Sequence, residues 1–388
     1  MPKLATFILC LISSVYSLHA QKDPIVIGTK NVIHSNVLQE DREYWVSLPE
    51  SYHQQSSSHK RYPLLVVLDG RSHFRSVTGV VNYMSFGYNS NRKVPEMIVV
   101  AVRNVNRERD FTPDKIITRR KNNTGGGDRF LSFLEDELVP QIDKEFRTEP
   151  YRILFGHSLA GLLATHAYMK EKTLFNAFIA VDPSFGSWDA PTMDKKLAAL
   201  TDQSFNRFLY MATANWGKRN IRNRNRHVRL YESLNSLCDG EFTAKLEYFE
   251  NENHGSVPLP AFYNGISTIF EGYGISDRDI ESKEQLLQQF RLLSQQLSYT
   301  FTPPETLVNR IAYRMLRSGN EDNRSKAMEF FILNTENYPD SFNAFDSLGE
   351  AYEALGDKKK AVSSYQKSLE LNQKNEHASE RIESLDKK

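Results

Sequence analysis

The sequence has little cysteine, no excess of either charge and no long run of hydrophobic residues. Cys10 and Cys238 are the two cysteines in 388 residues, and Cys10 lies in a segment that we expect to be removed. An intramolecular disulfide is therefore excluded from the predicted mature chain, whose stability must come from its core. We interpret Cys238 as a small apolar residue beside Leu237.

The charges balance closely. The chain carries 49 Lys and Arg against 48 Asp and Glu, and removal of residues 1–20 takes away only Lys3, which leaves 48 of each. Such a balance offers no general basic surface, so we expect no nucleic-acid partner. The composition, 40% hydrophobic and 25% charged, is that of an ordinary globular protein, and the length predicts two domains.

The first 20 residues are typical of a cleavable signal peptide. Lys3 is followed by an apolar run from Leu4 to Ile12 and then by small and polar residues up to Ala20. This run is too short to span a bilayer, so we expect no stable membrane anchor. The prediction is export to the periplasm or the medium after cleavage near Ala20. Because Leu18 is large for the third position before the cut, the exact cleavage site stays open.

Residues 21–276 have the pattern of an α/β domain. Short β-branched runs alternate with helical periodicity, which predicts a mostly parallel sheet flanked by helices. Residues 128–146 are expected to form an amphipathic helix, and Gly125, Gly126 and Gly127 before it a turn and not a phosphate loop. The expected strands are Tyr44–Leu48, Leu64–Leu68, Met97–Val102, Arg152–Phe155, Phe178–Val181, Arg207–Ala212 and Lys245–Phe249.

The remainder of the chain predicts a small all-α domain. Residues 277–303 have the composition of a connecting helix that ends at Pro303 and Pro304. Residues 304–388 then follow the 34-residue spacing of two tetratricopeptide (TPR)-like hairpins, with a polar capping helix from Asn375. Two such repeats rarely stand alone, so we expect them to pack on the α/β domain or on a second subunit, with a protein partner or self-association as alternatives. The spacing depends on Phe345, Leu348, Gly349, Tyr352, Ala361 and Tyr365.

The strongest chemical motif is the segment Gly156-His157-Ser158-Leu159-Ala160-Gly161. It joins an expected strand to a helical run, as in a nucleophile elbow, where a tight turn presents the serine Oγ above the sheet. Small neighbours allow the turn, and Ala160 stands where a second glycine is usual. We predict that Ser158 is a catalytic nucleophile.

A serine hydroxyl needs a base, and in this fold the histidine comes last in the chain. His254 follows the last expected strand and precedes a helical run, so we predict it as the general base. The third member stays open. Asn215 follows the strand that usually carries the acid, Asp182 follows the strand before, and Asp239 or a Ser/His dyad are further alternatives.

An acyl-transfer site also needs backbone donors for the oxyanion. The Leu159 N–H comes from the elbow itself, and the Gly70 or Arg71 amide is expected from the loop after the strand Leu64–Leu68. Trp188 and Trp216 are candidates for the wall of an acyl pocket.

Several segments together resemble one known family. They are similar to the "putative esterase" (esterase D-like) family of α/β-hydrolases, and within it to the branch with the enterobactin and salmochelin siderophore esterases, over roughly residues 25–275. The resemblance implies hydrolysis of small esters with no metal or organic cofactor. It also implies that Arg107, and with it Arg109, faces the substrate. The matching segments are Leu64–Gly70, Asn106–Pro113, the elbow, Asp182–Trp188 and His254–Pro258.

Together these features predict a serine carboxylic ester hydrolase acting through an acyl-enzyme. Two rival functions are a non-catalytic hydrolase-like scaffold that recruits a protein through the helical repeats, and an acyltransferase of the same fold. Six Lys or Arg residues and no acid lie between Lys218 and Arg229. These residues either attract an anionic ester to the site or form a solvated surface loop.

Overall fold

The computed structural model describes residues 24–86, 92–115, 123–170, 174–188, 190–200, 206–217, 221–237, 244–318 and 320–387. Within them an eight-stranded sheet has the order β1-β2-β4-β3-β5-β6-β7-β8. The pairs β1–β2 and β2–β4 are antiparallel, and all later pairs are parallel. The strands are β1 (Thr29–Ser35), β2 (Glu40–Ser47), β3 (Tyr62–Val67), β4 (Ile98–Val102), β5 (Thr148–His157), β6 (Ala177–Val181), β7 (Phe208–Ala214) and β8 (Ala244–Phe249). The sheet confirms the predicted α/β-hydrolase fold.

Two hydrophobic layers enclose this sheet. One face is covered by α1 (Gly70–Ser85) and α8 (Pro258–Ile269). The opposite face carries α2 (Arg107–Phe111), α3 (Gly127–Ser132), α4 (Val139–Glu145), α5 (Leu159–Tyr168), α6 (Ala190–Ala198) and α7 (Ile221–Leu237). A π-helical turn, Phe133–Leu138, joins α3 to α4, so the predicted helix 128–146 is continuous but not α-helical throughout. Short 3-10 helices lie at Glu50–His53, Gln55–Ser57, Phe185–Ser187 and Asp277–Asp279.

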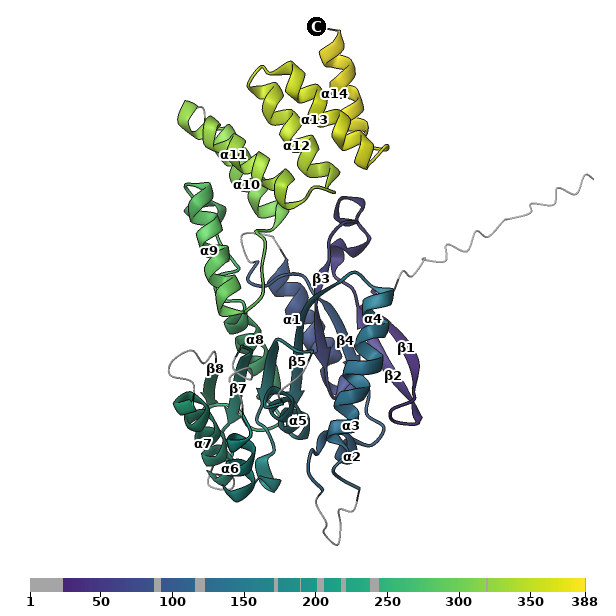
Figure 1. Cartoon of the computed structure of the whole chain (residues 1–388), viewed down its shortest axis with the longest axis vertical. Helices are drawn as coiled ribbons and strands as arrows, with labels where there is room; N and C mark the ends of the chain where they lie inside the picture. The colour runs from purple at the N-terminus through teal and green to yellow at the C-terminus, as the bar shows by residue number, and fades with distance from the viewer. Residues whose placement is uncertain are drawn as a thin grey trace, which may run out of the picture.

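The C-terminal region is helical, as expected. Its elements are α9 (Lys283–Gln296), α10 (Glu305–Leu316), α11 (Glu321–Asn337), α12 (Phe342–Ala354), α13 (Lys358–Leu371) and α14 (Glu376–Asp386). They stack in sequence away from the sheet (Figure 1). The pairs α10–α11 and α12–α13 occupy the two predicted hairpins, and α14 the predicted capping helix. Their classification as TPR repeats, and the domain boundaries, stay predictions.

The helical region shares its core with the α/β domain. A single hydrophobic cluster runs from the sheet through α8 and Phe290 of α9 to Phe301, Val308 and Phe331. Tyr151 of β5 packs edge-on against Phe301, with ring centroids 5.1 Å apart. The expectation that these helices pack on the α/β domain is therefore met within a single chain.

The helical region and the carboxyl ends of the parallel strands lie at opposite edges of the sheet. Gln55, just before β3, donates a hydrogen bond to Asn372 after α13. Glu149, at the start of β5, lines a cavity of about 400 Å³ together with Tyr299 and Tyr338. His157, the last residue of β5, lies eight residues further along the strand, which at about 3.3 Å per residue places it roughly 26 Å away.

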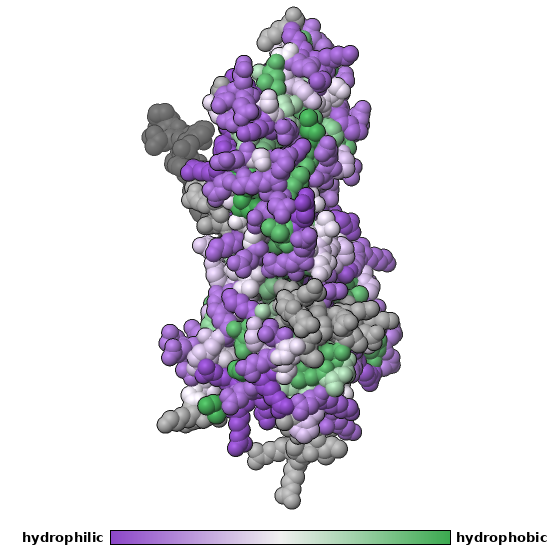
Figure 2. Space-filling view, turned by 60° about the vertical axis from the view of Figure 1, so that its left-hand side comes forward, coloured by the Kyte–Doolittle hydropathy of each residue, from purple (hydrophilic) through white to green (hydrophobic). Residues whose placement is uncertain are grey.

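The face that Figure 2 presents is largely hydrophilic, with scattered hydrophobic patches. Among the residues that the structure describes, no helix combines the length and the apolar character needed to cross a membrane. The predicted signal peptide, residues 1–20, lies outside the described residues.

Candidate active site

The predicted nucleophile elbow is present between β5 and α5. Ser158 has φ 62° and ψ −117°, a backbone conformation that residues other than glycine rarely adopt. The turn is closed so tightly that a Cβ on Gly156 would lie 2.2 Å from the carbonyl oxygen of Ala160. Gly156 is therefore required by the close approach of two backbone segments. The backbone strain is stored at the residue whose hydroxyl is presented above the sheet.

Three side chains from separate loops form one chain of hydrogen bonds. Nε2 of His254, in the loop after β8, lies 3.1 Å from Oγ of Ser158. Nδ1 of the same ring lies 2.6 Å from Oδ2 of Asp182, the residue directly after β6. Because a carboxylate can only accept, Nδ1 carries a proton and Nε2 is free to accept the serine proton. This is the geometry of a Ser-His-Asp triad.

The structure decides between the candidates for the third member. The side-chain amide of Asn215 donates to the carbonyl of Glu250 at 2.7 Å and accepts from the N–H of Gly217 at 2.9 Å. Asn215 therefore holds its own loop, and the prediction that it orients the histidine is wrong. Asp182 occupies that position. Asp239 lies outside the described residues.

Asp182 is buried, with 2% of its surface exposed. Burial alone would disfavour the carboxylate, but hydrogen bonds from His254 and from the indole of Trp216, 2.6 Å from Oδ2, outweigh it. They hold the pKa of Asp182 below its ordinary value. The backbone N–H of Ala214 approaches the other oxygen at 3.3 Å.

A buried histidine that the sequence reading missed supports the loop of Asp182. His227 of α7 is 0% exposed, its Nε2 lies 2.7 Å from the carbonyl oxygen of Pro183, and its Nδ1 pairs with the hydroxyl of Thr213. Burial lowers its pKa, so the ring is neutral at neutral pH. Asn223 donates to the same Pro183 carbonyl at 2.9 Å. A histidine at helical spacing in a basic run gives no sequence signal for this role.

Ser184 is a second residue that the sequence reading missed. Its Oγ lies 3.0 Å from Oγ of Ser158, and its backbone N–H donates to the carbonyl of Ser158 at 3.0 Å. If the Ser184 hydroxyl donates to Ser158, the proton of Ser158 is left to point at His254. The contact therefore favours the productive orientation of the nucleophile.

His157, beside the nucleophile, faces the catalytic ring. Its centroid lies 4.4 Å from that of His254, and His73 of α1 packs edge-on against it at 5.7 Å. Nε2 of His157 is buried with no hydrogen-bond partner among the described residues. Burial, with the neighbouring histidines, lowers the pKa of His157 to about 4, so it stays neutral beside His254.

The predicted oxyanion donors lie at two helix N-termini. Leu159 is the first residue of α5, and Gly70 and Arg71 are the first two of α1, positions whose N–H groups have no acceptor within the helix. These helices follow β5 and β3, which are adjacent and parallel, so the donors converge on one edge of the sheet. Asp69 turns the chain there with φ 53°.

Of the two arginines that the resemblance places against the substrate, Arg107 lies at the site and Arg109 is held in an ion-pair network. Arg107 is 35% exposed, makes a two-pronged pair with Asp69 at 2.7 and 2.9 Å, and approaches the carbonyl of His157 at 3.3 Å. It thus lies beside the elbow. Arg109 instead binds Glu40 and Asp110 in a network with the buried Arg42. Its substrate role has no support here, because its guanidinium is occupied by these carboxylates.

Trp188 does not line an open pocket. It is 0% exposed, stacks on Phe185 at 5.0 Å, and donates from Nε1 to Asp114 at 2.9 Å. The prediction that it contacts substrate is therefore wrong, because the core encloses it. Trp216 is 39% exposed and lies over His254 with centroids 4.6 Å apart, so it is the tryptophan at the site.

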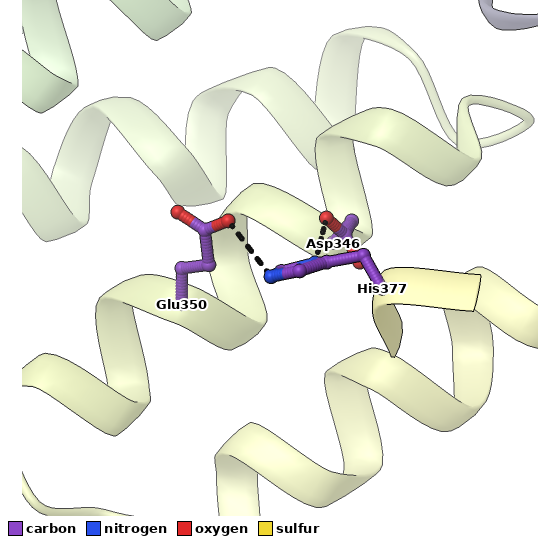
Figure 3. Close-up of side chains that lie close together, drawn as sticks. All are labelled: Asp346, Glu350 and His377. Carbon is purple, nitrogen blue, oxygen red and sulfur yellow. Dashed lines mark hydrogen bonds and ion pairs between the residues drawn. The ribbon is translucent and has the colours of Figure 1, made fainter. Parts of the chain in front are cut away.

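One group of potential metal ligands occurs in the described part of the chain, far from this site. Asp346 and Glu350 of α12 flank His377 of α14 (Figure 3). The Nδ1 of His377 lies 2.9 Å from Asp346 and Nε2 lies 3.5 Å from Glu350. Since one cation would take only one ring nitrogen, this arrangement fits a hydrogen-bonded bridge between the two helices better than a metal site.

Comparison with known proteins agrees with a serine esterase site. Residues 35–231, half of the chain, match the family described as "Putative esterase". The chain belongs to this esterase family. It is a carboxylic ester hydrolase, and the predicted family is confirmed.

Relatives of this esterase include siderophore esterases. The ferri-bacillibactin esterase BesA of Bacillus subtilis is 28% identical over 218 residues, which cover 50% of this chain and 74% of that protein. An IroE-like serine hydrolase from Shewanella oneidensis superposes with a TM-score of 0.69 and 26% identity, over 80% of this chain and 99% of that one. An uncharacterised protein from Capnocytophaga ochracea shares the fold over 93% of this chain and 100% of its own, at 22% identity and a TM-score of 0.59.

Proposed function

We propose that this esterase hydrolyses its substrate through an acyl-enzyme on Ser158, with His254 as general base and Asp182 as the third member. The observation that carries the proposal is the continuous chain from Ser158 Oγ through both nitrogens of His254 to Asp182, at 3.1 and 2.6 Å. The resemblance implied no cofactor, and the proposed steps need none.

The chemistry follows from the proton positions. Oγ of Ser158 attacks the ester carbonyl carbon while Nε2 of His254 takes the hydroxyl proton. Asp182 stabilises the resulting imidazolium through Nδ1–H. The oxyanion is met by the Leu159 amide and by that of Gly70 or Arg71. His254 then gives its proton to the leaving alkoxide. It next takes a proton from the water that attacks the acyl carbon, and returns this proton to Oγ of Ser158 as the acid leaves.

For the substrate we propose a siderophore ester of the cyclic trilactone type. Two relatives support this class, the ferri-bacillibactin esterase and a siderophore triacetylfusarinine C esterase of Aspergillus fumigatus, which is 39% identical over 62 residues (16% of this chain and 21% of that protein). The exposure of Arg107 and Trp216 beside Ser158 suits a bulky ligand. Positive charge near the site would favour an anionic ester.

Part of that positive charge comes from the start of α7. Asn223 and His227 of this helix hold the loop of Asp182, so the exposed Arg222 and Arg224 beside them lie near the catalytic edge of the sheet. Arg224 stacks on the ring of Tyr248 at 3.7 Å. Lys218 and Arg219 lie outside the described residues. This arrangement supports attraction of an anionic ester.

Hydrolysis of p-nitrophenyl acetate and butyrate by the mature chain, beside Ser158→Ala and His254→Ala, tests the mechanism. We expect turnover by the wild type and a loss on the order of 10³-fold or more in either variant. Trilactones with and without iron, followed by mass spectrometry, then test the substrate. An inert wild type on all of these esters would refute the proposal, and preferential transfer to an added alcohol would favour the acyltransferase alternative.

Export and partner binding stay predictions. The signal peptide predicts release into the periplasm or the medium, where ferric siderophores are met. Recruitment of a protein or self-association through residues 304–388 is tested by the mass of the purified chain in solution, alone and after incubation with an extract.

A further inference from the structure

Trp216 contacts both partners of the Asp182–His254 pair. Its indole N–H lies 2.6 Å from Oδ2 of Asp182, the same oxygen that lies 2.6 Å from Nδ1 of His254. Its ring lies 4.6 Å from the His254 ring, tilted by 46°. A single side chain thus touches the acid through a hydrogen bond and the base through its aromatic surface.

These contacts restrict Asp182 more than the triad alone does. A carboxylate oxygen that accepts two hydrogen bonds is fixed in rotation and in distance from each donor. The N–H of Ala214 holds the other oxygen at 3.3 Å. With both oxygens engaged, rotation of the carboxylate away from His254 would break the hydrogen bonds from Trp216 and Ala214.

The ring of His254 is confined from two sides. Trp216 lies at 4.6 Å and His157 at 4.4 Å, and these two neighbours make no ring contact with each other in the part of the chain that the structure describes. They therefore flank His254 on different sides. His157 stays neutral at neutral pH, so it packs against the imidazolium without adding a second positive charge, while the indole face attracts that charge.

We propose that Trp216 is a positioning residue of the catalytic site, which acts through Asp182 and His254 by fixing the shared carboxylate oxygen and by covering one side of the imidazole. The alternative is that the exposed indole only forms a wall for the substrate. The inference rests on the proposed function and goes beyond it, because nothing in the triad chemistry requires a tryptophan at this position.

The two roles can be separated with p-nitrophenyl butyrate, because loss of a substrate wall raises KM, whereas loss of positioning lowers kcat. Trp216→Phe keeps an aromatic ring over His254 but removes the N–H donor, and Trp216→Leu removes both. We expect kcat to fall about 10- to 100-fold in Trp216→Phe, the scale of one hydrogen bond to a charged group, with KM nearly unchanged. We expect a larger loss of kcat in Trp216→Leu.

A double-mutant cycle with Asp182→Ala decides whether the effect passes through the acid. Without the carboxylate the indole N–H has no partner there, so we expect Trp216→Phe to change kcat less than twofold in that background. Equal losses in both backgrounds, or a raised KM with unchanged kcat, would overturn the proposal. Titration of Ser158 with a phosphonate and a thermal melt confirm that each variant is folded, and Trp216→Leu carries the cycle if Trp216→Phe is not. An inert wild type would instead count against the proposed function.

Discussion

Replacement of Asp182 by Asn tests which residue completes the catalytic site, because it changes the hydrogen-bonding character of the side chain and leaves its size almost unaltered. In the wild type both oxygens accept: Oδ2 from His254 and Trp216, and Oδ1 from the N–H of Ala214. An asparagine has one acceptor oxygen and one donor nitrogen. It cannot satisfy all three donors.

Each orientation of the asparagine amide has a defined cost. With the nitrogen toward His254, Nδ1 must become the acceptor, so Nε2 carries the proton and cannot take that of Ser158. With the nitrogen toward Ala214, the correct tautomer is kept, but two donors face each other at a site where the distance is now 3.3 Å. Both orientations also remove the negative charge that stabilises the imidazolium. We expect kcat to fall on the order of 10³- to 10⁴-fold, which corresponds to about 4 to 5.5 kcal/mol of transition-state stabilisation.

The assay is hydrolysis of p-nitrophenyl butyrate, with Asn215→Ala as the matched control. Because the Asn215 side chain bonds, among the described residues, only to the backbone of Glu250 and Gly217, its removal should change kcat less than about fivefold, the scale of lost neutral hydrogen bonds at an exposed loop. A loss below tenfold in Asp182→Asn would show that a Ser/His dyad suffices. A larger loss in Asn215→Ala than in Asp182→Asn would refute the assignment of the acid.

Three further predictions concern other parts of the molecule. Ser184→Ala should lower kcat by about 3- to 10-fold with little change in KM, because one hydroxyl contact to Ser158 is lost; an unchanged kcat in steady-state assays would contradict the orienting role. Burial raises the pKa of Glu149 to about 7, whereas the unfolded state releases this proton near pH 4.5, so stability falls as pH rises from 4.5 to 7 and is constant above that range. Glu149→Gln should therefore raise the free energy of unfolding at pH 8 by about 1 to 3 kcal/mol and leave it similar below pH 4.5, as urea titrations at both pH values would show; a less stable variant at pH 8 would contradict this. Deletion of residues 304–388 should abolish soluble yield, because α10 and α11 share the core of the α/β domain. Deletion of residues 375–388 removes α14, which packs on α13 in a small separate cluster, and should leave esterase activity in place. Full activity of the longer deletion would show that the helical region is an accessory.

The helical region is placed where it stabilises the fold and not where it meets the substrate. Its contacts, such as Gln55 with Asn372 and Tyr151 with Phe301, lie at the edge of the sheet opposite to Ser158. Any effect of a partner bound there on catalysis would have to pass along the strands. This separation is consistent with a catalytic domain that uses only its own residues for chemistry.

Local sequence was sufficient for the features that depend on neighbours in the chain. The alternation of β-branched and helical segments predicted seven of the eight strands, and the elbow around Ser158 was readable because a tight strand-to-helix turn needs small residues at fixed positions. His254 was predicted from its order in the chain. The two helical hairpins in residues 304–388 were predicted from the repeat spacing of their apolar residues.

Only the tertiary structure decided which side chains meet. Asp182 and Asn215 both follow strands that end at the same edge of the sheet, and no local pattern tells which one reaches His254. Arg109 and Trp188 lie in segments that match the family, yet ion pairs hold the guanidinium of Arg109 and core packing encloses Trp188. The physical reason is the same in each case: hydrogen bonds and burial depend on residues that are distant in sequence, and these become neighbours only when the strands are placed side by side.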